Sequence, residues 1–369
     1  MLTAETAPAS HTDSAAPVEQ STALDLSDRL LHAVRIQQAA HVPLAQPRIL
    51  DVALLDMNYG WPNLGHDSIV RSLAELAHEL GPLLAGAGLK VRVLSYEVRS
   101  GGVLPEPPGS RFQVYVGSGG PGHLDPRNNN GIAPGSQGVA EDPSWEAPAF
   151  ALFDAIAAHP EAALIGICHS YGVMCRWAGI AHARFRSEAL GGKSTGVLEN
   201  LLTDAALEHP WFRRLAEQLP GQRRMRILDT RYFDLVPAPG ELPAGMTALA
   251  YETHGIGGPA GEALTMVEFA RDGGGEMPRL LGMNHHPEIG ERSRQIDILE
   301  RKLRAGEVTQ AWHDERSELM TRSYPEEDSD HLLRLTSEYT VLGPVRFHLR
   351  KMAEQRAAAL ALAAATPGY

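Results

Sequence analysis

Short apolar runs of strand length alternate with longer helical stretches from about residue 48 of this chain onward. The run RILDVALLDMN (48–58) is almost continuously apolar, and after a turn it is followed by the helical stretch IVRSLAELAHELGPLL (69–84). A strand that is buried on both faces has no polar side, so its sequence shows no alternation. Such strands, alternating with helices over short connections, predict an α/β fold with a parallel, flavodoxin-like sheet flanked by helices.

The same pattern continues through most of the chain. Further strands are predicted at 91–98, 112–117, 162–168, 225–233, 247–253 and 280–286, and further helices at 150–160 and 170–185. Residues 122–148 are rich in Gly, Pro and Asn, which predicts a long loop between a strand and a helix.

Two flanking regions differ from the α/β pattern. Residues 1–45 are predicted to be a disordered tail, rich in Ala, Ser, Thr and Pro up to about residue 20, followed by an amphipathic helix over 21–40. The α/β domain is assigned to residues 46–295. Residues 296–369 begin strongly charged and keep a helical period, which predicts a helical extension. This extension either caps the domain as a solvated amphipathic layer or serves in assembly.

The overall charge excludes two classes of partner. The formal net charge is -12, whereas binding to nucleic acid or to an anionic membrane surface needs a basic face. The N-terminus has no secretory signal pattern, and no apolar run approaches the roughly 20 residues of a membrane helix. We therefore expect a soluble, cytoplasmic protein that acts with small molecules or other proteins, and with neither nucleic acid nor membrane.

One of the two cysteines stands at a position suited to a nucleophile. Cys168 and Cys175 lie in one helical segment, which excludes a disulfide framework. Cys168 is placed where the predicted strand ALIGI (163–167) meets the following helix, with Gly166 and Ser170 as small neighbours. A nucleophile on such a sharp turn projects from the carboxyl edge of a sheet, and the helix N-terminus favours its thiolate. The alternative is an ordinary buried cysteine.

The segment LLGMNHHPEI (280–289) brings histidine and carboxylate to the end of a predicted strand. A cysteine nucleophile needs a base, and the base needs a third group that fixes its orientation. His286 and Glu288 are two residues apart, so on an extended chain their side chains leave the same face, whereas His285 points the other way and is expected to be structural. No third ligand stands at a recognisable spacing, so a metal site is not expected.

A glycine-rich stretch, VGSGGPG (116–122), follows another predicted strand. Its glycines let backbone N–H groups approach a substrate. Gly119 and Gly120, together with the N–H of His169, are predicted to stabilise the oxyanion of a tetrahedral intermediate. A plain glycine-rich turn is the alternative. The glycine spacing does not match a dinucleotide fingerprint, and GGKST (191–195) lacks the upstream glycine of a phosphate-binding loop, so no cofactor is expected.

Taken in order, these motifs resemble the class I, triad-type glutamine amidotransferases. That family shows S-G-G-P, then G-x-C-x-G-x-Q, then G-G-K and then H-P-E. The corresponding segments here are Ser118-Gly119-Gly120-Pro121, Gly166-Ile167-Cys168, Gly191-Gly192-Lys193 and His286-Pro287-Glu288. FDLVPAPGELPAG (233–245) is similar to the family's D-x-V-x-x-L-P-x-G, with an insertion. The resemblance covers roughly residues 48–295. It implies a Cys-His-Glu triad that hydrolyses glutamine through a γ-glutamyl thioester and passes the ammonia to a synthetase domain or subunit.

The departures from the family pattern fall on the substrate contacts and leave the triad intact. Gly172 stands where the family has the Gln that helps to hold the substrate glutamine. Arg231 and Tyr232 replace the Ser-His that precedes D-x-V in the family. His169, directly after Cys168, resembles the elbow of the PfpI-like branch of the same superfamily, in which an H-P-E segment is not expected.

The sequence therefore predicts a cysteine-dependent glutamine amidotransferase or glutaminase. In this interpretation Cys168 attacks the carboxamide, His286 moves the proton and Glu288 holds the imidazole. No synthetase module is visible in the chain, so the ammonia is expected to pass to a separate synthetase subunit. The alternatives are a related Cys-His-Glu hydrolase with a substrate other than glutamine, and a non-catalytic scaffold that keeps the amidotransferase-like domain.

Overall fold

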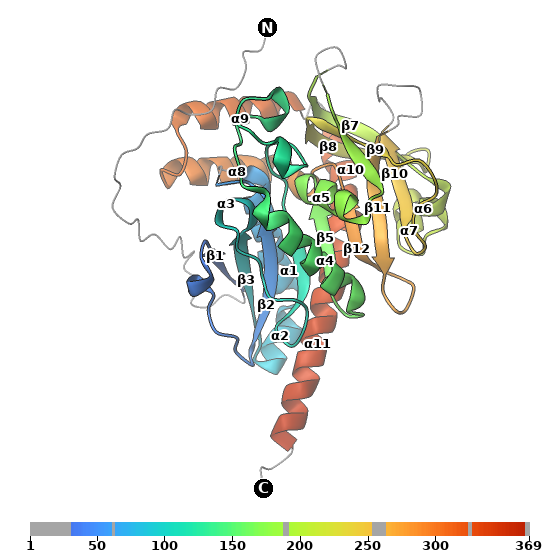
Figure 1. Ribbon diagram of the computed structural model, residues 1–369. Coiled ribbons are helices and arrows are strands. Elements are labelled where there is room, and N and C mark those ends of the chain that lie inside the picture. Colours follow the sequence, from blue (N-terminus) through green and yellow to red (C-terminus); the bar gives the residue numbers. More distant parts are fainter. Residues whose placement is uncertain (1–30, 61–62, 187–191, 253–262, 324–326, 366–369) are drawn as a thin grey trace.

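The centre of the protein is one mixed sheet of ten strands (Figure 1). The computed structural model describes residues 31–60, 63–186, 192–252, 263–323 and 327–365. Six neighbouring strands are parallel, in the spatial order β1 (Leu31–Ile36), β3 (Lys90–Glu97), β2 (Ile49–Asp56), β4 (Phe112–Gly117), β5 (Ala163–Ile167) and β12 (Pro278–Met283). The sheet continues with antiparallel pairing through β11 (Leu264–Arg271), β10 (Thr247–Glu252), β7 (Ser194–Leu202) and β8 (Arg224–Arg231).

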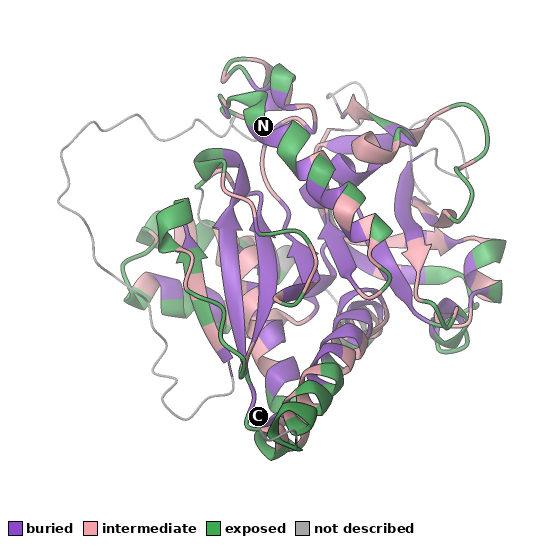
Figure 2. Cartoon of the chain, turned by 60° about the horizontal axis from the view of Figure 1, so that its bottom comes forward, coloured by how far each residue is buried: buried purple, intermediate pink, exposed green. Residues whose placement is uncertain are grey.

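Helices cover both faces of the parallel half of the sheet. One face packs against α1 (Leu64–Glu79), α2 (Gly81–Ala87) and α11 (Gly343–Ala365), and the opposite face packs against α4 (Glu146–Ala158) and α5 (His169–Ala178). Burial on both sides explains why strands such as β5 are apolar throughout, and Figure 2 shows them buried between partly exposed helices. The prediction of a flavodoxin-like α/β fold is confirmed.

Shorter elements complete the body. They are α3 (Val98–Gly101), α6 (Asp204–Glu208), α7 (Phe212–Ala216) and a separate two-stranded antiparallel sheet of β6 (Ala181–Phe185) and β9 (Phe233–Pro237). Three turns of 3-10 helix, Pro126–Asn128, Pro134–Ser136 and Pro143–Trp145, lie in the predicted long loop that precedes α4. This loop runs over the carboxyl ends of the parallel strands, where the candidate site lies.

Three glycines lie side by side where α5 meets the sheet. Gly166 of β5 is in register with Gly117 of β4 on one side and with Gly282 of β12 on the other. A Cβ at these three positions would come within 2.4, 2.4 and 2.3 Å, respectively, of side-chain atoms on α5, which belong to Met174, Ser170 and Tyr171. Only glycine therefore allows α5 to lie this close to the strands.

The C-terminal helices pack on the α/β body. They are α8 (Arg292–Arg304), α9 (Gln310–Ser323) and α10 (Glu327–Ser337), which continues through a turn of π-helix (Glu338–Leu342) into α11. Val345, Leu349 and Met352 of α11 are buried in the same apolar core as α1 and the sheet. The far end of α11 extends beyond the body in Figure 1. The boundary at residue 296 stays a prediction, but α11 itself covers a face of the sheet.

The prediction of an amphipathic helix over residues 21–40 is wrong for the part that the structure describes. Residues Leu31–Ile36 form β1, an edge strand that pairs in parallel with β3. Its two ends, Leu31 and Ile36, are buried and the residues between them are partly exposed, as pairing at the edge of a sheet allows. Pairing with the edge of the sheet therefore outweighs the local preference for a helix that the spacing of apolar residues indicated. The predicted tail and residues 21–30 lie outside the described residues.

Two further predictions need correction. The helix predicted over 170–185 ends at Ala178, because Gly179 adopts a left-handed conformation with φ 66° and terminates it, and β6 follows. The sheet is also not parallel throughout, since its second half is an antiparallel meander that includes β7 and β11, which the sequence pattern did not predict.

Replacing Leu349 with Ala is expected to lower the free energy of unfolding by about 2–5 kcal/mol. The side chain is 0% exposed between α11 and the sheet, so its loss leaves a cavity in the main core. Urea denaturation would measure the change. Leu44→Ala, at a position that is 85% exposed, is the matched control and should change stability by no more than about 0.5 kcal/mol. Equally small losses in the two variants would show that α11 is not part of the core.

Candidate active site

Cys168 occupies a strained turn between β5 and α5. Its backbone has φ 48° and ψ -100°, a left-handed φ that residues other than glycine rarely adopt. The turn is held by hydrogen bonds: the N–H of Cys168 donates to the carbonyl of Met283 at 2.7 Å, and its carbonyl accepts from Gly172 at 3.0 Å. Cys168 is partly exposed, whereas Cys175 is buried, and both thiols are free. Backbone strain of this kind is found at functional sites.

His286 and Glu288 form a hydrogen-bonded pair after the end of β12. Nδ1 of His286 lies 2.8 Å from Oε1 of Glu288. The expectation that both residues leave the same face of an extended chain is wrong, because Pro287–Ile289 is a turn of 3-10 helix that begins after His286. Pro287 fixes the first φ of this turn, and the turn brings the carboxylate back to the imidazole. The N–H of His286 donates to the carbonyl of Leu228 at 2.8 Å, which anchors the turn to β8.

The structure brings Cys168, His286 and Gly119 together. A Cβ on Gly119 would lie 2.9 Å from Cε1 of His286 and 3.5 Å from Cβ of Cys168. Burial alone disfavours the charged imidazole, but the Glu288 carboxylate and the Cys168 thiol raise the pKa of His286 well above its ordinary value. This environment favours an imidazolium beside the sulfur of Cys168.

Glu288 is buried against the N-terminus of α1. A Cβ on Gly65, in the first turn of this helix, would lie 2.6 Å from Oε1 of Glu288. Asn63 caps the helix by accepting a hydrogen bond from the N–H of His66 at 3.0 Å. The positive end of the helix dipole thus stabilises the carboxylate, while the pair with His286 compensates for its burial.

The glycine-rich stretch after β4 lies directly beside the elbow. The carbonyl of Ser118 accepts hydrogen bonds from Oγ of Ser170 at 2.7 Å and from its N–H at 3.3 Å, which ties the loop to the first turn of α5. The amide N–H groups of Gly119 and His169 make no hydrogen bond to any residue that the structure describes. A Cβ on Gly120 would lie 2.0 Å from the carbonyl oxygen of Met57, so this position requires glycine.

A buried arginine that the sequence analysis missed holds this loop in place. Arg99 donates to the carbonyls of Met57 at 2.9 Å and Pro121 at 2.6 Å, one at the end of β2 and the other in the loop. Its guanidinium also forms a bidentate pair with Glu141, at 2.9 and 2.7 Å, and both side chains are fully buried. Such forked geometry positions backbone as well as carboxylate. No local motif marked Arg99, because its partners come from three separate segments.

Two histidines next to the predicted triad are buried and neutral. Burial, reinforced by the Arg99 guanidinium, holds the pKa of the His169 ring well below its ordinary value. The ring is buried beside the backbone of Gly120, so only the backbone N–H of His169 matches the predicted role. Burial, with His286 and Arg231 nearby, lowers the pKa of His285 to about 3, which fits the structural role expected for it.

The departures from the family pattern replace polar contacts with apolar packing and internal ion pairs. The space that a side chain at Gly172 would fill is occupied by Leu124, whose Cδ1 would lie 2.5 Å from a Cβ there. Arg231 is buried and is paired with three carboxylates, which belong to Asp229, Asp234 and Glu252. Tyr232 stacks on Phe185 with ring centroids 6.3 Å apart. Of the predicted G-G-K segment, Gly191 lies outside the described residues and Lys193 lies over the Tyr232 ring.

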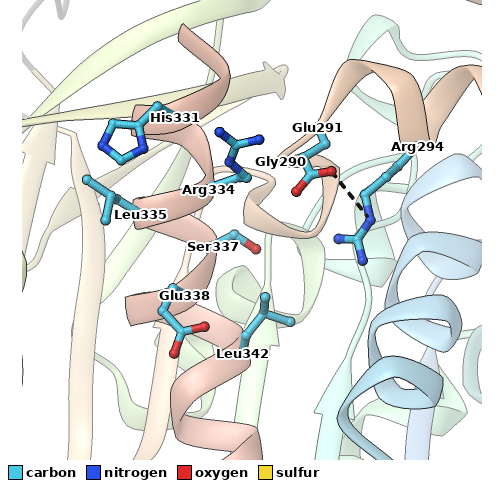
Figure 3. A pocket seen from close by; sticks show the side chains of 9 residues that line it. All are labelled: Gly290, Glu291, Arg294, His331, Arg334, Leu335, Ser337, Glu338 and Leu342. Atoms are coloured by element: carbon cyan, nitrogen blue, oxygen red, sulfur yellow. Dashed lines mark ion pairs between the residues drawn. The ribbon is translucent and has the colours of Figure 1, made fainter. Parts of the chain in front are cut away.

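A depression of about 270 Å³ lies behind the His-Pro-Glu turn, between the start of α8 and α10 (Figure 3). Glu291 and Arg294 form an ion pair at 3.7 Å on one side of it, and Arg334 lies on the other side. None of the three predicted catalytic residues lines this depression. It is therefore separate from the site at Cys168.

Two kinds of feature are absent from the described part of the chain. No three His, Cys, Asp or Glu side chains are grouped there in a way that would hold a metal ion. Nor does any described helix combine the length and the apolar character that crossing a membrane requires.

Comparisons with known proteins show similarity to solved structures only. No protein-family model and no curated protein matches the chain. A glutamine amidotransferase from Thermotoga maritima is similar at 14% identity, covering 83% of this chain and 98% of that chain, with a TM-score of 0.43. A putative GMP synthase component from Thermoplasma acidophilum is similar at 13% identity, covering 64% of this chain and 85% of that chain, with a TM-score of 0.37. At these values the similarity carries no argument about activity, which rests on the geometry.

Replacing Glu288 with Gln is expected to lower the pKa of His286, because the carboxylate that stabilises the imidazolium is removed. NMR titration of the His286 ring would measure this directly. A folded pKa above the unfolded value of about 6.5 means that the charged ring contributes stability below that pH. This contribution is lost as the pH rises through the folded pKa. It amounts to about 1.4 kcal/mol for each tenfold change in the acid dissociation constant.

The stability difference between wild type and Glu288→Gln should accordingly be larger at pH 6 than at pH 9. Glu291→Gln is the matched control, because Glu291 pairs with Arg294 and lies outside the contact with His286. A His286 pKa that is the same in wild type and Glu288→Gln would refute the electrostatic role of the carboxylate.

Introducing the family's glutamine as Gly172→Gln is expected to reduce stability by about 1–3 kcal/mol, because Leu124 already fills the space. Combining it with Leu124→Ala should recover part of the loss. The coupling energy from a double-mutant cycle, measured by urea denaturation, should be about 0.5–3 kcal/mol. Purely additive effects would mean that the two positions do not share one space.

Proposed function

We propose that this protein is a cysteine-dependent hydrolase that cleaves a primary carboxamide through a thioester. The observation that carries the proposal is the arrangement around His286: it is hydrogen-bonded to Glu288 on one side and adjoins the strained Cys168 on the other. This arrangement supplies a nucleophile, a proton carrier and an orienting carboxylate in one buried cluster.

In the first half of the reaction the Cys168 thiolate attacks the amide carbon. The resulting tetrahedral intermediate carries an oxyanion. When it collapses, the C–N bond breaks and the His286 imidazolium gives its proton to the leaving nitrogen, which departs as ammonia. An acyl thioester on Cys168 and a neutral imidazole remain.

In the second half a water molecule attacks the thioester carbon while His286 accepts the proton of the water. The C–S bond breaks, the carboxylic acid leaves, and the thiolate and imidazolium are restored. Glu288 holds the ring in one orientation throughout and stabilises its charged form. The net reaction converts one amide and one water into one acid and one ammonia.

Stabilisation of the oxyanion is assigned to the backbone beside the elbow. The N–H groups of Gly119 and His169 have no partner among the described residues, and Gly119 adjoins Cys168. Arg99 and Ser170 donate hydrogen bonds to carbonyl groups of this loop and hold its backbone in place. The two N–H donors therefore need no rearrangement during the reaction. Gly120 contributes by allowing the close contact with Met57.

Glutamine is the amide that the sequence motifs predict, with its ammonia passed to a separate synthetase subunit, and both remain predictions. The apolar packing at Gly172 and the internal pairing of Arg231 favour the alternative of another acyl group. The chemistry is the same for either substrate, because these departures lie outside the triad.

The protein can be exposed to a diazo-ketone analogue of glutamine and examined by intact mass and peptide mapping. This experiment tests both the activated cysteine and the choice of glutamine as substrate. Labelling of Cys168 that glutamine blocks would establish glutamine as the substrate. If the analogue fails but iodoacetamide modifies Cys168 rapidly, an activated nucleophile with another amide is supported. If neither reagent reacts, the hydrolase proposal is overturned in favour of a scaffold.

Cys168→Ala should lower kcat for ammonia release from any amide substrate by at least about 10³-fold, as other deletions of a catalytic nucleophile do. The circular dichroism spectrum should stay unchanged. Cys175→Ala is the control, because its thiol is buried on α5 and makes no contact with the triad. Full activity in Cys168→Ala would contradict the mechanism.

A further inference from the structure

A depression of about 460 Å³ opens between the long loop after β4 and the end of β6. Its walls include His123, Pro134 and Phe185, with Arg127 and Asn130 also among the lining residues. It lies beside the elbow, because Leu124, the neighbour of His123, packs against Gly172 one turn after Cys168. None of the predicted catalytic residues lines this depression, but Leu124 connects its wall to the helix that begins after Cys168. Its volume is typical of a small-molecule pocket.

The two rings that line this depression, Phe185 and His123, contact further aromatic rings inside the protein. The ring centroids of Phe185 and Phe233 are 5.5 Å apart, and the Phe185 ring is stacked on Tyr232 at an interplanar angle of 12°. The ring of His123 meets Phe233 edge-on at 4.7 Å. Burial, which outweighs the nearby Asp125 carboxylate, lowers the pKa of His123, so this ring is neutral at pH 7. Phe185 and His123 thus give this part of the wall two uncharged rings.

Among the described residues, no Asp or Glu lines this depression, so none of them offers a carboxylate there to the α-ammonium group of a free amino acid. The two nearby buried arginines are already neutralised within the protein: Arg186 pairs with Asp234, and Arg231 pairs with Glu252. Arg127 remains on the rim, where its side chain is 58% exposed and is paired with Asp125.

The side of the depression toward α5 is also apolar. Position 172, one helical turn from Cys168, carries no side chain, and Leu124 covers it with methyl groups. Both residues are buried, so the packing between Cys168 and the depression is apolar. Aromatic rings prefer offset or edge-to-face contact with other rings, which rewards a planar ring in the substrate.

We infer that the acyl group of the substrate ends in an aromatic ring that packs against Phe185, so that this protein is an aryl-alkyl carboxamide hydrolase. The inference rests on the proposed function and specifies the substrate class of the same site. The amide carbon is attacked by Cys168, ammonia leaves, and the ring-bearing carboxylic acid is released by water, as in the reaction described above.

The test compares ammonia release from three primary amides: 3-phenylpropanamide, 3-cyclohexylpropanamide and glutamine. The first two have the same chain between ring and amide and differ in aromaticity, and glutamine carries the charged amino-acid group. We expect kcat/KM for 3-phenylpropanamide to exceed that for glutamine at least tenfold and that for the cyclohexyl compound severalfold. A preference for glutamine would overturn the inference while leaving the hydrolase proposal standing.

Variants of the aromatic wall locate the ring. Phe185→Leu keeps most of the apolar volume but removes the ring, and it should raise KM for 3-phenylpropanamide about tenfold with little change in kcat. Phe347→Ala is the control and should change neither, because Phe347 lies on α11 next to His348, which contacts the carbonyl of Pro278 at the first residue of β12. Equal effects of the two variants would overturn the assignment of the pocket.

Binding of the product acid separates the two proposals. Calorimetry with 3-phenylpropanoate and the Cys168→Ala protein needs no turnover. Binding that is weakened in a Phe185→Leu, Cys168→Ala double variant, without hydrolysis of any amide by wild type, would sink the proposed function and support the aromatic site. Absence of binding, together with turnover of glutamine by the wild type, would support the proposed function and overturn the aromatic site.

Discussion

The contact between α5 and the glycines of β4, β5 and β12 is the constraint on which the site depends. Because Gly166 is in register with both Gly117 and Gly282, the helix lies directly on three strands. A methyl group at any position of this row would come within 2.4 Å of a side chain on α5, so the contact could not keep its present geometry. Since β12 also leads the chain into His286, the same row helps to set the distance between Cys168 and His286.

Buried charge is used in two different ways around this contact. Arg99 and Glu141 form a buried pair, and the remaining donors of Arg99 hold the backbone beside Cys168, including the loop of the proposed oxyanion donors. The carboxylates around Arg231 neutralise it inside the protein. Hence the surroundings of the proposed catalytic residues are polar and hydrogen-bonded, whereas the surface proposed to receive the rest of the substrate carries aromatic rings.

The parts of the fold that could be predicted were those encoded by local pattern. The apolar run of β2 and the turn at Cys168 each carry their signal within about ten residues. β1 could not be predicted, because its spacing satisfies a helix as well as a strand, and the exposed edge of β3 decided the outcome.

The candidate site divides in the same way. The association of His286 with Cys168 followed from motif order, although the predicted backbone between His286 and Glu288 was wrong. Arg99 and Leu124 were not predictable, because their roles depend on which distant segment each one meets. The motif order indicated the triad, and only the tertiary packing of Leu124 showed what replaces the family's glutamine.

The position of β12 has a consequence for how the chain matures. This strand lies between β5 and β11 near the middle of the sheet, yet it is the last strand in the sequence. About 120 residues separate Cys168 from His286, so at ribosomal speed the thiol waits roughly 6–24 s for its base. During that time the edge of β5 that later pairs with β12 is unpaired. A chain truncated before β12 would lack both His286 and Glu288, so in the proposed mechanism Cys168 gains its base only when the sheet is complete.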